Sequence, residues 1–327
     1  MVEKTQMSGT GYLSDKAGGL EYVGRFAPSP TGPLHFGSLV AAIGSYLQAK
    51  SVNGRWLVRM EDIDPLREVE GAADLILRTL EAYGFEWHGE VLWQSSRVEA
   101  YQHVLDDLCR RSLAYPCGCS RKQQAENRAA LKLPAGVYPG TCRSRSVSAG
   151  VGRQAIRLLV EPVDITFHDR LQGEQRQHLV QDVGDFVLFR ADGQFAYQLA
   201  VVVDDAAQGI TEVVRGSDLI DSTPRQIYLQ QVLGLPTPGY LHLPVAVNGA
   251  GEKLSKQTYA TPLPLDDPLP LLWHALHFLG QSPPHDLLKG GVGEFWQWAI
   301  SHWHLENVTP SLFAPSPVCA VANSSTP

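Results

Sequence analysis

The sequence RFAPSPTGPLHFGSL, residues 25–39, decides the fold. A short strand pattern at 21–26 runs into it, and the prolines and glycine of its first part exclude helix and sheet there. Apolar residues then recur at helical spacing over 39–47, and a strand of alternating character follows at 55–60. The order strand, stiff loop, helix, strand predicts an α/β fold with a parallel sheet.

The composition limits the class of protein. The 327 residues suggest two domains, or one large domain with an insertion. The net charge of −7 excludes a global basic field, so any RNA contact must be local. Five cysteines, an odd number, exclude a disulfide scaffold, and no apolar run reaches the length of a membrane helix. The N-terminus lacks the apolar part of a secretory signal, so we expect a soluble, cytoplasmic protein with no membrane partner.

Apolar and turn patterns predict further elements. Two amphipathic helices are expected, at 69–82 with an apolar stripe that begins at Val69, and at 97–113 with an apolar stripe that begins at Val98. A third helix is expected to begin at Ser222-Thr223-Pro224, which provide a hydroxyl cap and a proline in the first turn. The expected strands are 185–190 and 195–203, on either side of an Asp192-Gly193 hairpin turn, and 211–215.

These patterns divide the chain into six segments. They are a disordered leader (1–20), the first half of the α/β domain (21–113), an inserted subdomain (114–190), the second half of the domain (191–258), a helical C-terminal part (259–306) and a disordered tail (307–327). A cysteine pair, prolines, glycines and a basic run mark the insertion.

Two groups of residues indicate phosphate chemistry. His35 and Gly37-Ser38 stand at a helix start, where backbone amides bind anions, a glycine admits a ligand and a histidine can donate to phosphate. Lys253, Ser255 and Lys256 follow a Gly-rich loop, and two lysines around a serine can stabilise charge on a transferring phosphate. Taken singly, the groups also fit a proline-rich turn with a capping histidine and a solvated loop.

Together these groups resemble the HIGH and KMSKS signatures of class I aminoacyl-tRNA synthetases. The stretches RMEDIDP (59–65), YQLAVVVDD (197–205) and VRGSDL (214–219), with 25–32, further resemble the glutamyl subclass of these enzymes over about residues 21–300. The resemblance implies a Rossmann-type parallel sheet and ATP, with Mg²⁺, bound by His35, Gly37, Ser38, Lys253, Ser255 and Lys256, of which His35 and Lys256 are catalytic. Phe36, Ser38, Leu254 and Gln257 depart mildly from the signatures.

The same resemblance implies a site for L-glutamate. Glutamate has two carboxylates, which suit arginine forks, and an ammonium group, which suits a carboxylate. The resemblance assigns this site to Arg25, Phe26, Ala27, Pro28, Ser29, Glu61, Tyr197 and Arg215. Which arginine holds which carboxylate stays open, and each residue alone also fits a surface ion pair or a core tyrosine.

Cys117-Gly118-Cys119 and Cys142 have a metal-like spacing within the insertion. Three thiolates and a fourth ligand would complete a tetrahedral structural zinc site and stabilise a segment with little apolar content. Spacing alone leaves ordinary cysteines equally open. The glutamyl-type resemblance implies one structural Zn²⁺ here with Tyr138 as the fourth ligand, whereas Cys109 is expected in the core on an amphipathic helix and Cys319 in the tail.

The part of the chain after Lys256 has one lysine, no arginine and five acidic residues. RNA binding requires phosphate neutralisation by basic residues, so we expect no anticodon-binding domain there. A glutamyl-type catalytic half without an RNA-reading half resembles the family of glutamyl-Q tRNA(Asp) synthetases. This resemblance implies tRNA-independent activation of L-glutamate with ATP, then transfer of glutamate to the queuosine base at the wobble position of tRNA(Asp), with a monomer as the default.

RNA contact is expected at the insertion, which carries the main local basic cluster. Its members are Arg121, Lys122, Arg128, Lys132, Arg143, Arg145 and Arg153. A solvated polar face is the alternative interpretation, which the density of basic residues disfavours.

Three other functions stay open. A minimal glutamyl- or glutaminyl-tRNA synthetase that charges a tRNA 3′ end is disfavoured by the acidic C-terminal part. A HIGH-type nucleotidylyltransferase for a small molecule is disfavoured by the zinc-type insertion and the glutamate-type pocket. A catalytically inactive paralogue is disfavoured because His35, Glu61, Arg215 and Lys256 are all present.

Overall fold

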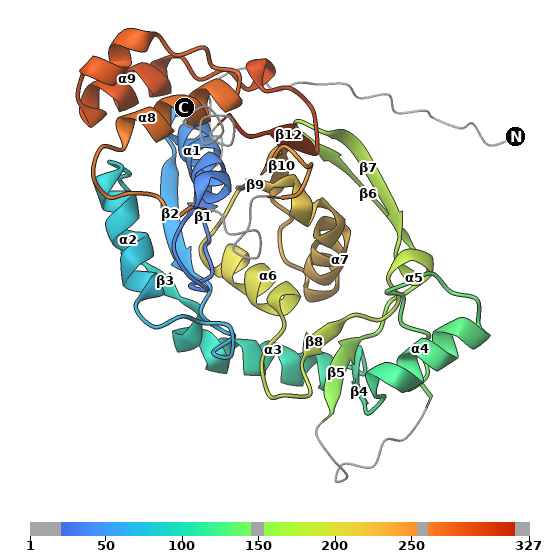
Figure 1. Ribbon diagram of the computed structural model, residues 1–327. Helices are drawn as coiled ribbons and strands as arrows, with labels where there is room; N and C mark the ends of the chain where they lie inside the picture. Colours follow the sequence, from blue (N-terminus) through green and yellow to red (C-terminus); the bar gives the residue numbers. More distant parts are fainter. Residues whose placement is uncertain (1–20, 145–153, 254–260, 318–327) are drawn as a thin grey trace, which may run out of the picture.

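Two groups of parallel strands lie edge to edge in the computed structural model, which describes residues 21–144, 154–253 and 261–317 (Figure 1). The first sheet, of order β1-β2-β3, consists of β1 (Val23–Phe26), β2 (Arg55–Met60) and β3 (Leu92–Trp93). The second contains the parallel pair β9 (Glu212–Gly216) and β10 (Gly239–Leu243). The Thr211 amide donates to the Val23 carbonyl and the Thr211 hydroxyl accepts from the Val23 amide, both at 2.9 Å. The predicted α/β fold with a parallel sheet is confirmed.

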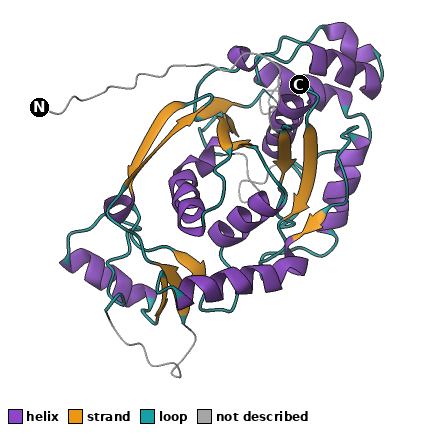
Figure 2. Cartoon of the chain, turned by 180° about the vertical axis from the view of Figure 1, so that it is seen from behind, coloured by secondary structure: helices purple, strands orange, loops and turns teal. Residues whose placement is uncertain are grey.

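Helices cover both faces of these strands (Figures 1 and 2). Side chains of β2 alternate between two apolar clusters, with Trp56 and Val58 in one and Leu57 in the other. The helices of the first cluster are α1 (Phe36–Lys50), α2 (Ala72–Ala82), α8 (Leu269–Phe278) and α9 (Val292–Ser301). Those of the second are α3 (Val98–Arg110), α6 (Tyr197–Ala207) and α7 (Thr223–Leu233).

The segment predicted as an insertion forms an antiparallel sheet and a hairpin. The sheet, of order β4-β5-β8, consists of β4 (Ala114–Cys117), β5 (Ala155–Leu158) and β8 (Val187–Phe189). The hairpin consists of β6 (Asp164–Asp169) and β7 (Gly173–His178), and it gives the second sheet the order β7-β6-β10-β9. Asp169 pairs with Tyr240 of β10, so this segment extends the α/β domain at one sheet edge. The remaining helices of the segment are α4 (Arg121–Ala130) and the short α5 (Leu179–Asp182).

Short elements complete the described chain. They are the 3₁₀ helices η1 (Gln94–Arg97), η2 (Ser217–Ser222), η4 (His285–Lys289) and η5 (Leu305–Asn307) and the parallel strands β11 (Val245–Val247) and β12 (Phe313–Pro315). Within the described ranges, no helix is both long and apolar enough to cross a membrane.

The expectation of disorder from 307 onward is wrong for 307–317. The Val245 amide donates to the Leu312 carbonyl, and the Ser316 amide donates to the Val247 carbonyl. A short strand of this kind is stabilised by its partner edge and has no periodic pattern of its own, so its sequence reads as a loop. The predicted leader, 1–20, and residues 318–327 lie outside the described residues.

The expected strand at 195–203 is also wrong, because helix α6 occupies most of it. Residues 199–205 are all buried, so the apolar run shows no helical period, and β-branched valines imitate a strand. The Asp192-Gly193 turn does exist, since the Gly193 amide donates to the Arg190 carbonyl at 3.0 Å. After one antiparallel bridge between Phe189 and Phe195, however, the chain enters the helix.

The other predicted helices and the strand at 211–215 are present, with local differences. The strand at 211–215 and the helix from 223 are confirmed, with a proline in the first turn, but the Ser222 side chain does not cap this helix. Val69 and Val98 are 52% and 48% exposed, so they are not part of the buried stripes. Val98 is the first residue of α3, whereas Val69 precedes Gly71, the N-cap residue of α2, and so lies outside that helix.

Gly280 permits a close approach between the end of α8 and the C-terminal part. Its φ is +74°, and a Cβ there would lie 2.2 Å from the carbonyl oxygen of Asn307. We expect Gly280→Ala to lower the free energy of unfolding by about 2–4 kcal/mol, because left-handed strain adds to a backbone clash. Gly234→Ala is the control, since Gly234 has φ +66° and a Cβ there would have no described atom within 4 Å apart from its chain neighbours, so this change should cost only about 1 kcal/mol. Urea unfolding followed by tryptophan fluorescence measures both, and equal losses would contradict the clash.

Candidate functional site

A cleft of about 750 Å³ opens at the ends of β1 and β9. One wall is the proline-rich loop with the start of α1, and the other is formed by the segments after β9 and β10. The lining includes Phe26, Ala27, Pro28, Ser29, His35, Gly37 and Ser38 on the first wall and Gly216, Asp218, Leu219, Leu243 and Lys253 on the second. The structure therefore brings His35, Gly37 and Ser38 together with Lys253, the described member of the second predicted group, at the carboxyl ends of parallel strands, where ligands bind in α/β sheets.

His35 is the N-cap residue of α1 and lines the cleft. Its Nδ1 accepts from the Ser38 amide at 3.3 Å, and the Ser38 hydroxyl accepts from the His35 amide at 3.5 Å. Because Nδ1 accepts, the neutral ring carries its proton on Nε2, which makes Nε2 a donor suited to phosphate oxygen. Capping and phosphate binding are thus compatible, since they use different ring nitrogens.

Lys253 lines the cleft from the second wall. Its Nζ donates to Asp218 Oδ2 at 2.6 Å. Sequence analysis missed Asp218 as a site residue, although it lies in the stretch VRGSDL. A Cβ on Gly216 would lie 2.5 Å from Asp218 Oδ1, so a larger residue there would require this carboxylate to turn away. Ser255 and Lys256 lie outside the described residues, and their roles stay predictions.

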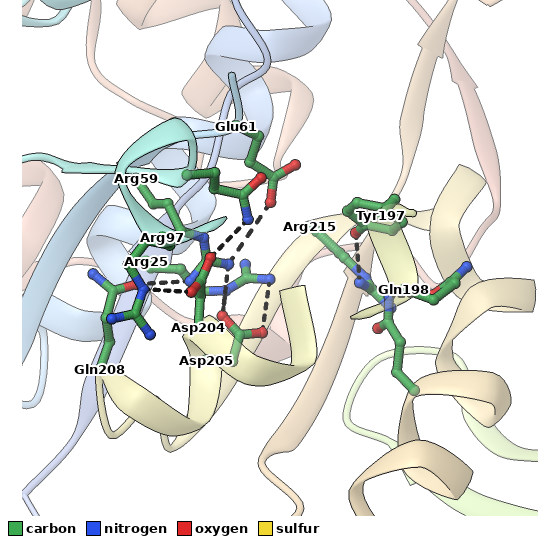
Figure 3. Close-up of polar contacts among 12 residues, drawn as sticks. Arg25, Arg59, Glu61, Arg97, Tyr197, Gln198, Asp204, Asp205, Gln208 and Arg215 are labelled. Carbon is green, nitrogen blue, oxygen red and sulfur yellow. Dashed lines mark hydrogen bonds and ion pairs between the residues drawn. The ribbon is translucent and has the colours of Figure 1, made fainter. Parts of the chain in front are cut away.

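Next to the first wall lies a buried ion cluster of Arg25, Arg59, Glu61 and Asp205 (Figure 3). Asp205 Oδ1 accepts from Arg25 Nε at 3.1 Å and from Arg59 Nη2 at 2.7 Å. Arg59 Nη2 also lies 3.7 Å from Glu61 Oε1. Arg25 was predicted to bind a ligand carboxylate, and it is already paired with Asp205. Sequence analysis missed Arg59 and Asp205, although both lie within stretches that carry the family resemblance.

Glu61 is an unusual member of this cluster because its carboxylate has a raised pKa. Burial raises this pKa to about 7, although the charges of Arg59 and Arg25 act in the opposite direction. The carboxylates of Asp205 and Asp204 also raise it. Glu61 therefore changes its charge near neutral pH.

Arg215 and Tyr197 form a second polar group (Figure 3). Arg215 Nη1 donates to the Tyr197 hydroxyl at 3.1 Å. Burial raises the pKa of Tyr197, and the charges of Arg215, Glu61 and Arg25 also act on it. Because charges shift a pKa only at short range, Arg25, Glu61 and Arg215 all lie near Tyr197.

Asp204 fixes the helix that carries Tyr197 and Asp205. Its buried carboxylate accepts from Gln94 Nε2 at 2.8 Å, Arg97 Nε at 3.0 Å and the Tyr101 hydroxyl at 2.6 Å. These contacts tie α6 to η1 and α3, so adjacent aspartates serve different functions: Asp204 positions the helix and Asp205 neutralises arginines.

The predicted zinc ligands lie together in the insertion. The Sγ atoms of Cys117, Cys119 and Cys142 lie within 4.8 Å of one another. The Tyr138 hydroxyl lies 3.2 Å from Cys117 Sγ and 4.0 Å from Cys119 Sγ. A tetrahedral Zn²⁺ with Zn–S bonds of about 2.3 Å separates its sulfurs by about 3.8 Å, so this donor set fits the ion. Cys109 is exposed on α3, so the expectation that it lies in the core is wrong. Cys319 lies outside the described residues.

The predicted basic cluster is divided by the fold. Arg143 donates from Nη2 to buried Asp185 at 2.6 Å, so it connects parts of the insertion. Arg121, Lys122, Arg128 and Lys132 lie on or just after α4, which buries no residue. Arg145 and Arg153 lie outside the described residues. The basic surface that the structure describes is therefore centred on α4.

Comparisons with known proteins agree with this geometry. A family model described as "tRNA synthetases class I (E and Q), catalytic domain" matches residues 21–266. A Dechloromonas aromatica protein named glutamyl-Q tRNA(Asp) synthetase is 59% identical over 88% of this chain and 95% of its own length. A Pseudomonas aeruginosa protein of the same name is 56% identical over 86% and 93%.

A solved structure is similar at lower identity. It is a glutamate tRNA ligase from Elizabethkingia meningosepticum in complex with its amino acid. The TM-score is 0.75 at 25% identity, over 91% of this chain and 67% of that chain. The similarity therefore extends from sequence to most of the fold.

Replacement of one thiol tests the zinc assignment. We expect Cys117→Ser to lower bound zinc well below one ion per chain and to lower the melting temperature, because a structural zinc site contributes folding energy. Cys109→Ser is the matched control, since Cys109 is exposed and outside the cluster. Elemental analysis and thermal unfolding measure the two effects. A Cys117→Ser protein with a full complement of zinc would show that the ligand set is wrong.

Proposed function

This chain belongs to the class I tRNA synthetases for glutamate and glutamine and, within them, to the glutamyl-Q tRNA(Asp) synthetases, and we propose its activity on that basis. It is a ligase that forms glutamyl-adenylate from L-glutamate and ATP without tRNA. It then transfers the glutamyl group to queuosine at the wobble position of tRNA(Asp). The observation that carries the proposal is the cleft, whose walls bring His35 and Lys253 to one edge of the sheet. We expect it to act as a monomer in the cytoplasm.

Adenylate formation requires positioned phosphates and charge stabilisation. The α-carboxylate oxygen of glutamate attacks the α-phosphorus of ATP, and pyrophosphate leaves. His35 Nε2 and the start of α1 hold the phosphates, and Lys253 and Lys256 stabilise the charge that develops on them. Gly37 allows the nucleotide to approach the backbone. Mg²⁺, when it is bound with ATP, neutralises phosphate charge.

Glutamate binding uses the two polar groups near the cleft. Glu61, when ionised, accepts from the ammonium group, while Arg215 and the Tyr197 hydroxyl donate to a carboxylate. Arg25 contributes positive charge near the same region, although Asp205 already accepts from it. Ala27 and Ser29 of the loop line the cleft itself. Which carboxylate meets Arg215 stays open.

Transfer completes the reaction. A hydroxyl oxygen of the queuosine cyclopentenediol attacks the carbonyl carbon of the adenylate, AMP leaves, and an ester forms. The basic surface on α4 supports the RNA, since phosphate contacts require exposed basic side chains. Cys117, Cys119, Tyr138 and Cys142 hold one structural Zn²⁺ at the start of this helical segment.

Two assays test this function. ATP–pyrophosphate exchange without tRNA should respond to L-glutamate and not to L-glutamine or L-aspartate. Labelled glutamate should then become attached to tRNA(Asp) with an intact queuosine diol, and periodate cleavage of the diol should abolish attachment. An unmodified tRNA(Asp) transcript is the matched control, because it keeps its 3′ end and lacks queuosine.

The same assays identify other functions. Labelling of the unmodified transcript would indicate that the enzyme charges a 3′ end, as a minimal glutamyl-tRNA synthetase does. An absence of exchange with all three amino acids would contradict tRNA-independent activation. ATP–pyrophosphate exchange without attachment of glutamate to either tRNA would indicate that the enzyme activates the amino acid for a different acceptor.

Glu61 gives the glutamate step a pH dependence. Only the carboxylate form carries the negative charge that pairs with the ammonium group, and the pKa of Glu61 is about 7. We therefore expect KM for glutamate to rise as the pH falls from about 8 to about 6, while KM for ATP stays level. Glu61→Gln cannot ionise and should raise KM for glutamate at every pH and remove this dependence. Exposed Glu99→Gln is the control, and a Glu61→Gln profile identical to the wild type would contradict the role.

A further inference from the structure

Arg215 is a buried cation whose direct partners are all neutral. Its Nη1 donates to Tyr197, its Nη2 donates to Thr223 Oγ1 at 2.8 Å and to the Leu219 carbonyl at 3.4 Å, and its Nε donates to His242 Nε2 at 3.0 Å. Within the described ranges, no carboxylate lies at ion-pair distance from it. Four of its five N–H groups are bonded in this way, and the fifth lies on Nη1, beside the Tyr197 hydroxyl.

His242 sets the position of this guanidinium. It lies opposite Arg215 in the register of β10 and β9, and its ring is fully buried. Arginine Nε is always a donor, so His242 Nε2 must be the acceptor and the proton must lie on Nδ1. Burial and the charge of Arg215 hold the pKa of His242 below its usual value, although Asp169 and Asp218 act against this. The ring is therefore neutral at pH 7.

Asp169 fixes the tautomer of His242. Its Oδ2 accepts from His242 Nδ1 at 2.6 Å, and its Oδ1 accepts from the amides of Leu171, Gln172 and His242 at 3.0, 2.8 and 3.3 Å. These three amides hold the carboxylate in one orientation. Asp169 ends β6, so this anchor comes from the segment that sequence analysis placed in the insertion.

We infer that Asp169 and His242 are positioning residues for amino-acid binding, which act by holding Arg215 with its free N–H and its charge available to a substrate carboxylate. This inference rests on the proposed function. A direct aspartate partner would neutralise Arg215, as Asp205 does for Arg25 and Arg59. A neutral histidine orients the guanidinium and leaves its charge for the ligand, whose carboxylate then completes the ion pair.

Asp169→Asn is the sharpest variant because it keeps the shape and reverses the hydrogen bond. Its amide oxygen should occupy the position that accepts from three backbone amides, so its NH₂ faces His242 Nδ1. The imidazole proton then moves to Nε2, where it opposes the Arg215 Nε–H. A wrong tautomer of this kind disables histidine in other enzymes with little change of geometry.

The first measurement needs no substrate. Two-bond ¹H–¹⁵N spectra of histidine-labelled protein distinguish the two tautomers, and the spectrum of His242→Gln identifies the signal of His242. We expect the Nδ1–H tautomer in the wild type at about pH 7.5 and its loss in Asp169→Asn. An Nε2–H tautomer or an imidazolium in the wild type overturns the inference, whatever the enzyme acts on.

The second measurement is the split between KM and kcat in ATP–pyrophosphate exchange. Asp169→Asn and His242→Leu should raise KM for L-glutamate about ten-fold or more, because a buried charged donor loses its acceptor. KM for ATP should stay within about two-fold. His242→Gln offers an amide oxygen to Arg215 Nε and should restore part of the affinity.

Asp185→Asn is the matched control for stability. Asp185 is another buried aspartate with several hydrogen bonds, and it lies in the insertion away from the cleft lining. This variant should lower the melting temperature and leave KM for glutamate unchanged. If Asp169→Asn and His242→Leu behave like Asp185→Asn, the pair is merely structural and the inference fails. If the wild type shows no exchange with glutamate, the proposed function fails, and the tautomer measurement still decides the inference.

Discussion

The junction between Val23 and Thr211 is the constraint on which the site depends. Two hydrogen bonds between these residues hold the first sheet and the parallel pair of β9 and β10 edge to edge. Because the strands on both sides of the junction run in the same direction, their carboxyl ends meet. The loop after β1 then brings His35 to the cleft, and the segment after β9 brings Asp218. Arg215 lies next to the last residue of β9. Neither sheet forms the cleft alone.

The buried arginines around this junction have two kinds of hydrogen-bond partner, a carboxylate or neutral groups. Arg25 and Arg59 share the carboxylate of Asp205, which compensates for the desolvation of two guanidinium groups and fixes their geometry. Arg215 is bonded to neutral groups, and the nearest carboxylate of its hydrogen-bond chain is Asp169, on the far side of His242. The shared carboxylate of Asp205 fixes the geometry of Arg25 and Arg59, whereas the neutral partners of Arg215 leave its positive charge available to a ligand.

The insertion contributes residues to the proposed RNA contact and to the proposed amino-acid site. Its cysteine cluster and α4 lie at the start of the segment, where RNA contact is proposed. Its hairpin strand β6 pairs with β10 and places Asp169 against His242. Under the proposed function, a segment defined by its breaks in the α/β pattern therefore supports the proposed amino-acid site. Movement of the hairpin relative to β10 would reach Arg215 through two hydrogen bonds.

The sequence by itself determined the α/β class, the loop with His35, the cysteine set and the family, because local patterns and motif spacing carry these features. The prediction from sequence was wrong at 195–203, because most of this helical segment is buried on all sides and its apolar residues show no helical period. It was also wrong at 313–315, because this strand forms only by pairing with β11. Only the tertiary structure decided that Arg25 is paired and that Arg215 is positioned through His242. Those partners are far apart along the chain, and a charge acquires its function from what the fold places beside it.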